Sequence, residues 1–188
     1  HMAVASFDLA ERLQTPVLVL SDLDIGMNDW MIPEFEWDES YEPDRGKVLS
    51  AAELESMDKF YRYLDVDGDG IPYRTLPGVH PKGSYFTRGS GHTKYGSYTE
   101  DSVAYQDVVD RLLVKWDTAR TLVPAAEIRY ADFNSMAVLT VGSGHAACVE
   151  ALDRLQEQDT NLNYCRVKGF PFGPDVRDFI ARHDVVFV

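Results

Sequence analysis

The sequence predicts an α/β fold in which a parallel sheet is flanked by helices. The main observation is that strand and helix patterns alternate through the last third of the chain. Apolar runs typical of buried strands occur at 135–142, 161–170 and 185–188, with amphipathic helical patterns between them. This alternation is the βαβ connection of a parallel sheet. The apolar run at 17–20 is a further strand pattern, of the kind that is buried on both faces.

The first two elements are a helix and that strand. The helix is expected over residues 3–13, and Pro16 separates it from the strand. One helix and one strand cannot bury a sheet face by themselves, and the apolar pattern at 185–188 leaves an open strand edge. We therefore expect the chain to be a piece of a larger protein, interrupted at both ends. The apolar face of the first helix consists of Val4, Phe7, Ala10 and Leu13.

The middle of the chain is irregular apart from two helices. An acidic connector without a clear period precedes Ser50 and Glu53, which form a capping box and predict a helix over 51–63. A second helix, capped by Asp101 or Ser102, is expected over 103–119. The inward faces expected of the later helices are Tyr105, Val108, Val109, Leu112, Leu113 and Trp116, then Ala146, Val149, Leu152 and Leu155, then Val176, Phe179 and Ile180.

The composition is that of a soluble globular protein. Of the 188 residues, 45% are hydrophobic and 26% are charged, and no apolar run is long enough to span a bilayer. The formal net charge of −13 disfavours nucleic acid and anionic membrane surfaces as partners, because like charges repel. Cys148 and Cys165 have neither metal-site nor disulfide-framework spacing, so we expect buried, reduced thiols in a cytoplasmic protein.

An acidic loop with the letters DVDGDG begins at residue 65. Asp65, Asp67 and Asp69, followed by Gly70, match the first half of a calcium loop. An EF-hand also needs a glutamate at its twelfth position, which is Leu76 here, so the EF-hand interpretation fails. A Ca²⁺ or Mg²⁺ site of another kind stays open. So does the alternative that the Asp-Gly pairs only make tight turns.

A long basic loop follows the acidic one. Arg74, Lys82, Arg88 and His92 lie among glycines, prolines and aromatic residues, together with His80. In so acidic a chain these cations are candidates for binding a carboxylate or phosphate. The alternative is a surface loop that packs on a neighbouring subunit.

Two further places are typical of ligand contacts in α/β folds. Gly142 and Ser143 form a turn between a strand and a helix, where free N–H groups suit an anion, although Ser143 as a helix N-cap also explains the turn. Asp22, Asp24 and Asn28 come just after the strand at 17–20, at the carboxyl end where such folds bind ligands. The sequence contains no G-x-G-x-x-G, P-loop, HExxH, CxxC or nucleophile-elbow motif.

Four segments carry a resemblance to a known family. They are FDLAERLQTPVLVLSDLDIGMNDWM (7–31), DRGKVL (44–49), RYLDVDGDGIPYRTLPGVHPKGSYFTRGSGHTKYGSYTED (62–101) and RDFIARHDVVFV (177–188). Together they resemble the alpha subunit of 2-oxoacid:ferredoxin oxidoreductases, in particular the 2-oxoglutarate synthase type. The resemblance extends over essentially the whole chain, and the loop from Asp65 is its most specific part.

The resemblance implies a division into three parts. Residues 1–30 would be the end of a thiamine pyrimidine-binding domain. Residues 31–125 would be a linker with helices and the long loop. Residues 126–188 would be a truncated transketolase C-terminal-like domain.

The resemblance also implies an activity. Enzymes of this family oxidise a 2-oxoacid with coenzyme A and give an acyl-CoA, CO2 and reduced ferredoxin. Thiamine diphosphate with Mg²⁺ and an iron–sulfur cluster serve as cofactors, mainly in a partner beta subunit. The implied partners are the beta subunit, ferredoxin, the 2-oxoacid and coenzyme A, in an oligomer. No catalytic residue of the family falls in this chain, because those motifs lie before residue 1, so the chain is expected to be inactive alone.

The resemblance places Arg74, Lys82, Arg88 and His92 in a loop near the 2-oxoacid. It places Asp22, Asp24 and Asn28 near the thiamine ring. The turn from Gly142 to Ala147 departs from the family's usual Gly-Ser-Thr-Glu-like run, because Gly144 and His145 follow Ser143, and this puts a coenzyme A contact there in question. Two rival functions remain: a non-enzymatic calcium-binding or interaction module, and a pyruvate or branched-chain 2-oxoacid oxidoreductase subunit.

Overall fold

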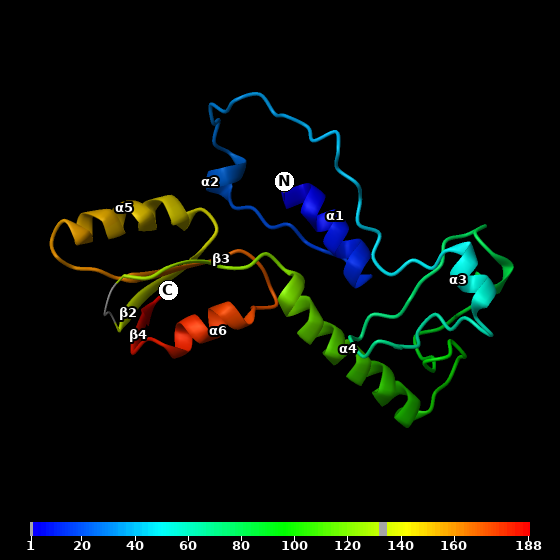
Figure 1. The fold of residues 1–188 in the computed structure, drawn as a ribbon. Helices are drawn as coiled ribbons and strands as arrows, with labels where there is room; N and C mark the ends of the chain where they lie inside the picture. The colour runs from blue at the N-terminus through cyan, green and yellow to red at the C-terminus, as the bar shows by residue number, and fades with distance from the viewer. Residues whose placement is uncertain (1, 132–134) are drawn as a thin grey trace. The chain divides into compact units, whose positions relative to one another are not determined.

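The computed structural model describes residues 2–131 and 135–188 (Figure 1). The chain folds as two compact units, one made of the stretch up to Leu18 with Glu42–Ala119, the other of Val19–Tyr41 with Arg120–Val188. None of the helices within the described ranges is long and apolar enough to cross a membrane. In chain order the elements are α1 (Met2–Leu13), α2 (Leu23–Gly26), α3 (Ala51–Ser56), η1 (Pro81–Gly83), α4 (Ser102–Leu122), β1 (Glu127–Arg129), β2 (Met136–Val141), α5 (Gly144–Gln156), β3 (Asn163–Val167), α6 (Pro174–Ala181) and β4 (Val185–Phe187).

The second unit is built on a four-stranded sheet in the order β1-β3-β2-β4. β2 pairs in parallel with β3 and with β4, whereas β1 pairs antiparallel with β3. α5 and α6 lie on opposite faces of this sheet (Figure 1). The predicted α/β fold with flanking helices is therefore confirmed. The antiparallel edge strand β1 was not predicted, because its three residues are too short to show a period.

The core of this unit lies between the sheet and α6. Its buried residues are Ala137, Cys165, Val167, Val176 and Phe179. The predicted inward residues Val176 and Phe179 are confirmed, but Ile180 is exposed. On α5 the prediction was wrong for Ala146, which is exposed, and the partly buried face consists of His145, Cys148, Val149, Leu152 and Leu155. α5 has no fully buried residue, whereas α6 buries Val176 and Phe179 against the sheet.

The first unit has a small core around α3. Leu49, Leu54 and Phe60 are buried there, with Met57 and Tyr73 packed against them. The capping box of Ser50 and Glu53 is present, but α3 ends at Ser56, earlier than the predicted residue 63. The reason is that the Lys82 ammonium binds the main-chain oxygens of Glu55 and Met57, at 2.6 and 3.2 Å, and the chain turns away there.

The predicted inward face of α4 is only partly correct: Val108 and Val109 are partly buried, but the rest of that face is not. The expected inward residues Tyr105, Leu112, Leu113 and Trp116 are all exposed. Instead, the Arg111 guanidinium donates to the Gly70 oxygen at 2.7 Å, and the Thr118 hydroxyl donates to the Asp69 oxygen at 2.7 Å. The acidic loop therefore lies directly against this helix.

Residues 17–20 do not form the predicted strand in the described part of the chain. A strand needs the N–H and C=O groups of a neighbouring strand, and none pairs with these residues. Leu18 and Leu20 are consequently 83% and 87% exposed.

Candidate functional site

The structure brings together two sets of residues that the sequence analysis had singled out separately. Asp22 and Asp24 meet the turn at Gly142 and Ser143, within the second unit. The Ser143 N–H donates to Asp22 Oδ2 at 3.0 Å, and the Ser143 hydroxyl donates to Asp24 Oδ2 at 3.3 Å. A carboxylate of the chain itself thus takes the position in which an anion was expected at this turn.

Asp22 is placed by two elements at once. Its Oδ1 accepts the Ile25 N–H at 3.0 Å and so caps α2, while Oδ2 faces the start of α5. Hydrogen bonds from the Ser143 side chain and from the N–H groups of Ile25 and Ser143 hold the pKa of Asp22 below its ordinary value. Gly142 has φ +65°, and a Cβ there would lie 3.1 Å from Asp22 Oδ2. The turn is therefore shaped for a bare backbone next to this carboxylate.

Ser143 stands at the N-cap position of α5, as one interpretation of the turn expected, but its side chain does not cap the helix. Its φ and ψ are already helical, and its side chain makes no capping hydrogen bond. The Ser143 hydroxyl lies 3.3 Å from Asp24 Oδ2 and also stabilises the charged form of Asp22, so it serves both carboxylates and not the helix. Asn28 is exposed and lies outside this group of contacts.

Two of the four basic loop residues serve the fold of the first unit. Arg74 pairs with Glu11 and donates to the Arg45 oxygen at 2.8 Å. Lys82 binds the main-chain oxygens at the end of α3, as described above. Since both cations have partners within their own unit, neither is poised for an external carboxylate in this arrangement.

Arg88 and His92 are placed differently. The Arg88 side chain is exposed, with its guanidinium carbon 5.9 Å from the centre of the Tyr98 ring. The His92 ring stacks on Tyr63 with 3.9 Å between centroids and 23° between planes, and its Nδ1 lies 3.1 Å from the Thr93 oxygen. Arg88 is therefore the loop cation that is most open to a ligand, held over an aromatic face.

The acidic loop does not have the geometry of a metal site. Asp65 accepts the N–H groups of Gly68 and Gly70, at 2.9 and 2.8 Å, while Asp67 and Asp69 contact the Lys47 ammonium. Across residues 2–131 and 135–188, no three His, Cys, Asp or Glu side chains are grouped so that they could hold a metal ion. As they stand, these carboxylates do not fit a bound divalent cation.

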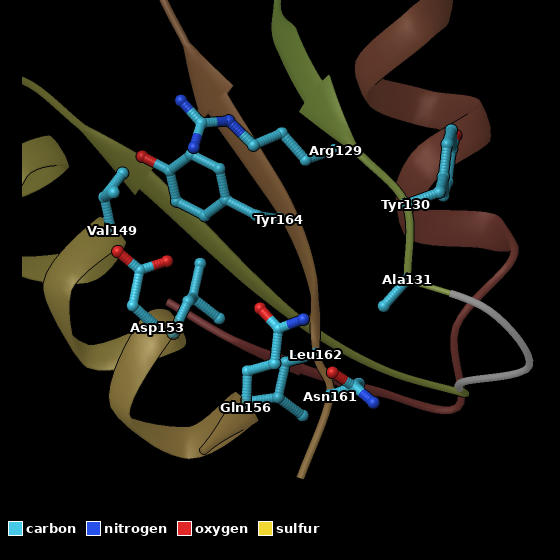
Figure 2. A pocket seen from close by; sticks show the side chains of 10 residues that line it. Arg129, Tyr130, Ala131, Val149, Asp153, Gln156, Asn161, Leu162 and Tyr164 are labelled. Atoms are coloured by element: carbon cyan, nitrogen blue, oxygen red, sulfur yellow. The ribbon is translucent and has the colours of Figure 1, made fainter. Parts of the chain in front are cut away.

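A hollow of about 270 Å³ lies between α5 and the edge of the sheet, and sequence reasoning missed it. In Figure 2 Arg129 lies beside the Tyr164 ring, and Asp153 and Gln156 extend from α5. The Tyr164 hydroxyl lies 2.8 Å from His145 Nδ1. No signal could have revealed this hollow, because β1, which forms one wall, was not predicted. It is lined by Arg129, Tyr130, Ala131, Val149, Leu152, Asp153, Gln156, Asn161, Leu162 and Tyr164.

The fold is one that occurs in a solved oxidoreductase. The chain is similar to 2-oxoglutarate:ferredoxin oxidoreductase from Magnetococcus marinus, solved with 2-oxoglutarate, coenzyme A and succinyl-CoA bound. The TM-score is 0.77 at 21% identity, and the match covers 95% of this chain and 30% of that one. At this identity the likeness establishes the fold.

Curated relatives point in the same direction. The chain is 27% identical over 170 residues to 2-oxoacid:ferredoxin oxidoreductase 2, subunit alpha, of Aeropyrum pernix, which covers 88% of this chain and 25% of the relative. It is 25% identical over 185 residues to 2-oxoacid:ferredoxin oxidoreductase 1, subunit alpha, of Sulfurisphaera tokodaii. That match covers 96% of this chain and 27% of the relative. The chain thus spans about a quarter of the length of these relatives. No protein-family model matches it.

Proposed function

We propose that the chain is part of the alpha subunit of a 2-oxoacid:ferredoxin oxidoreductase. The observation that carries this proposal is similarity to curated alpha subunits over 88% to 96% of the chain, accompanied by a fold match over 95% of it. Because the chain spans only about a quarter of those subunits, the activity belongs to the assembled enzyme. The 188 residues alone are expected to be inactive.

The reaction converts a 2-oxoacid and coenzyme A into an acyl-CoA and CO2, and two electrons reduce ferredoxin. Thiamine diphosphate, held with Mg²⁺ mainly by a partner beta subunit, supplies the carbanion chemistry when it is bound. An iron–sulfur cluster of the partner carries the electrons. This is consistent with Cys148 and Cys165, which lie apart, one partly buried on α5 and one fully buried in β3.

The substrate that we favour is 2-oxoglutarate. The Magnetococcus marinus enzyme with this fold was solved with 2-oxoglutarate bound, and the basic loop offers a cation for a second carboxylate. Within that loop we assign substrate contact to Arg88, whose guanidinium is exposed, and exclude Arg74 and Lys82, which have partners in their own unit. His92 orders the loop through its stack on Tyr63.

The substrate is tested by product identification. The full-length subunit is assembled with its partner, loaded with cofactors and incubated with coenzyme A, ferredoxin and one 2-oxoacid at a time. Succinyl-CoA from 2-oxoglutarate, detected by mass spectrometry, is the expected product. Acetyl-CoA from pyruvate or a branched acyl-CoA as the preferred product reassigns the substrate class. No acyl-CoA from any 2-oxoacid contradicts the proposal.

The role of Arg88 is tested by Arg88→Gln in the assembled enzyme. Loss of one charged contact to a carboxylate should raise KM for 2-oxoglutarate about tenfold, with little change in kcat. Arg154→Gln is the matched control, since Arg154 is an exposed arginine paired with Glu150 on α5. Equal KM values for the two variants would show that Arg88 does not contact the substrate.

A further inference from the structure

The carboxylates of the acidic loop already bind a cation of the chain itself, the Lys47 ammonium. The Lys47 Nζ lies 2.7 Å from Asp67 Oδ2, 2.8 Å from Asp69 Oδ1 and 2.9 Å from the Ile71 main-chain oxygen. An ammonium has three N–H donors, and these three acceptors match them one to one. Two carboxylates and one carbonyl around a single positive charge are also the kind of oxygen ligands that a calcium loop offers its ion.

The third carboxylate of the motif, that of Asp65, binds the backbone of the loop and not Lys47. Asp65 receives the N–H groups of Gly68 and Gly70 and so closes the turn from inside. Asp69 Oδ1 also accepts the Ile71 N–H at 2.9 Å. The oxygens that a calcium loop would direct at a metal are thus shared between the backbone and Lys47.

The surroundings of Lys47 favour its charged form. Its side chain is 20% exposed, and Nζ lies 5.3 Å from the centre of the Tyr73 ring. Partial burial by itself would lower the pKa of Lys47, but the hydrogen bonds that it donates to Asp67 and Asp69, together with their negative charges, raise that pKa above its ordinary value. The same contact with Lys47 holds the pKa of Asp67 below its ordinary value.

The ammonium also connects parts of the chain that are distant in sequence. Lys47 precedes Val48, which forms a bridge with Arg74 just beyond the loop. On its other side the loop lies against α4, through the contacts of Arg111 and Thr118 with Gly70 and Asp69. Fixing the loop therefore fixes the start of the basic segment relative to α4.

We propose that the Lys47 ammonium is the permanent cation of this loop, in the place that a metal ion takes in a calcium loop, and that the loop folds without a metal. A divalent ion would have to displace the ammonium and would be repelled by it at close range. Removal of the ammonium leaves two carboxylates and a carbonyl facing one point. The two negative charges then repel each other unless another cation binds between them.

The experiment compares wild type with Lys47→Met, which keeps most of the side-chain stem and removes the charge. Ca²⁺ and Mg²⁺ are titrated by calorimetry, and thermal midpoints are measured in EDTA and in each metal. Lys94→Met is the matched control, because Lys94 is an exposed lysine whose Nζ likewise lies near a tyrosine ring, 5.7 Å from the centre of Tyr95.

The expected result for wild type is no binding heat and the same thermal midpoint with and without metal. Lys47→Met should melt about 5 °C lower in EDTA and recover part of the loss in Ca²⁺, with a Kd of about 1 mM or tighter. Lys94→Met should do neither. Stoichiometric Ca²⁺ or Mg²⁺ binding by wild type that Asp67→Asn abolishes would overturn the proposal. If Lys47→Met does not fold, the wild-type protein still tests the proposal, because a thermal midpoint that is higher in Ca²⁺ than in EDTA would contradict it.

Discussion

At the scale of single residues, charged side chains of the chain itself occupy places where sequence patterns indicated outside ligands. Asp22 takes the backbone N–H that was expected to face an anion, although it lies 121 residues before Ser143. The Lys47 ammonium donates to the carboxylates of Asp67 and Asp69, which lie 20 and 22 residues away in the sequence. A motif shows that acceptors or donors gather at a place. It does not show which distant side chain satisfies them.

The contact between Lys47 and Asp67 makes stability depend on pH at both extremes. The pKa of Lys47 is raised from 10.5, so its contribution is complete below that value and is lost as pH rises through the higher folded pKa. The pKa of Asp67 is lowered from 3.8, so its contribution is complete above that value and is lost as pH falls through the lower folded pKa. Thermal midpoints of wild type and Asp67→Asn should differ by a constant amount between about pH 5 and 9 and converge toward either extreme. A difference that varies within that window would show that another group governs the contact.

The two cysteines should differ in reactivity. Burial raises the pKa of Cys165 to about 11, and its side chain is sealed in the core, whereas Cys148 is partly exposed on α5. The prediction that both thiols are buried therefore holds for Cys165 alone. In the folded protein at pH 8, Ellman's reagent should label one thiol per chain, and in denaturant it should label both. Cys148→Ser should abolish the folded-state reaction. Labelling that persists in this variant would contradict the buried position of Cys165.

At the scale of elements, local signals predicted where helices begin better than where they end or which way they face. The capping box of Ser50 and Glu53 is local, and it marks the start of α3 correctly. The end of α3 is set by Lys82, and the face of α4 by the acidic loop, and both are contacts between distant parts of the chain. For the same reason the parallel strands of the second unit were predictable from their apolar runs, whereas β1 and the exposed state of residues 17–20 were not.

The contact of the acidic loop with α4 depends on Gly70. Its φ is +79°, and a Cβ there would lie 2.3 Å from the Lys115 N and 2.7 Å from the Arg111 oxygen. Gly70→Ala should therefore lower the free energy of unfolding by about 3 kcal/mol, since it adds overpacking to backbone strain. Gly68→Ala is the matched control, because Gly68 has φ +77° with nothing near its Cβ position, and it should lose only about 1 kcal/mol. Equal losses in urea unfolding would mean that α4 does not press on the loop.

At the scale of the whole molecule, many large apolar side chains are exposed. Leu18, Leu20, Trp30, Met31 and Phe35 are among them, and they follow one another over a short stretch of the chain. Exposed apolar surface of this extent is typical of residues that contact other protein. This agrees with a chain that spans about a quarter of its curated relatives.

We expect the 188-residue chain to associate with itself in solution. The unpaired apolar residues at 17–20 and the edge strand β4 offer backbone groups and apolar side chains to a second copy. Sedimentation velocity should show a sedimentation coefficient that rises with concentration. Replacing Leu18 and Leu20 by lysine should reduce this rise. A monomer at every concentration in wild type would contradict the expectation.

We propose that these residues belong to an enzyme that passes electrons from a 2-oxoacid to ferredoxin. The experiment that tests this proposal follows ferredoxin reduction by absorbance under anaerobic conditions, with the full-length subunit assembled with its partner. We expect reduction to require both a 2-oxoacid and coenzyme A, and we expect the isolated 188-residue chain to reduce no ferredoxin. Ferredoxin that stays oxidised with every 2-oxoacid, in an assembled enzyme that contains thiamine diphosphate and its cluster, would contradict it.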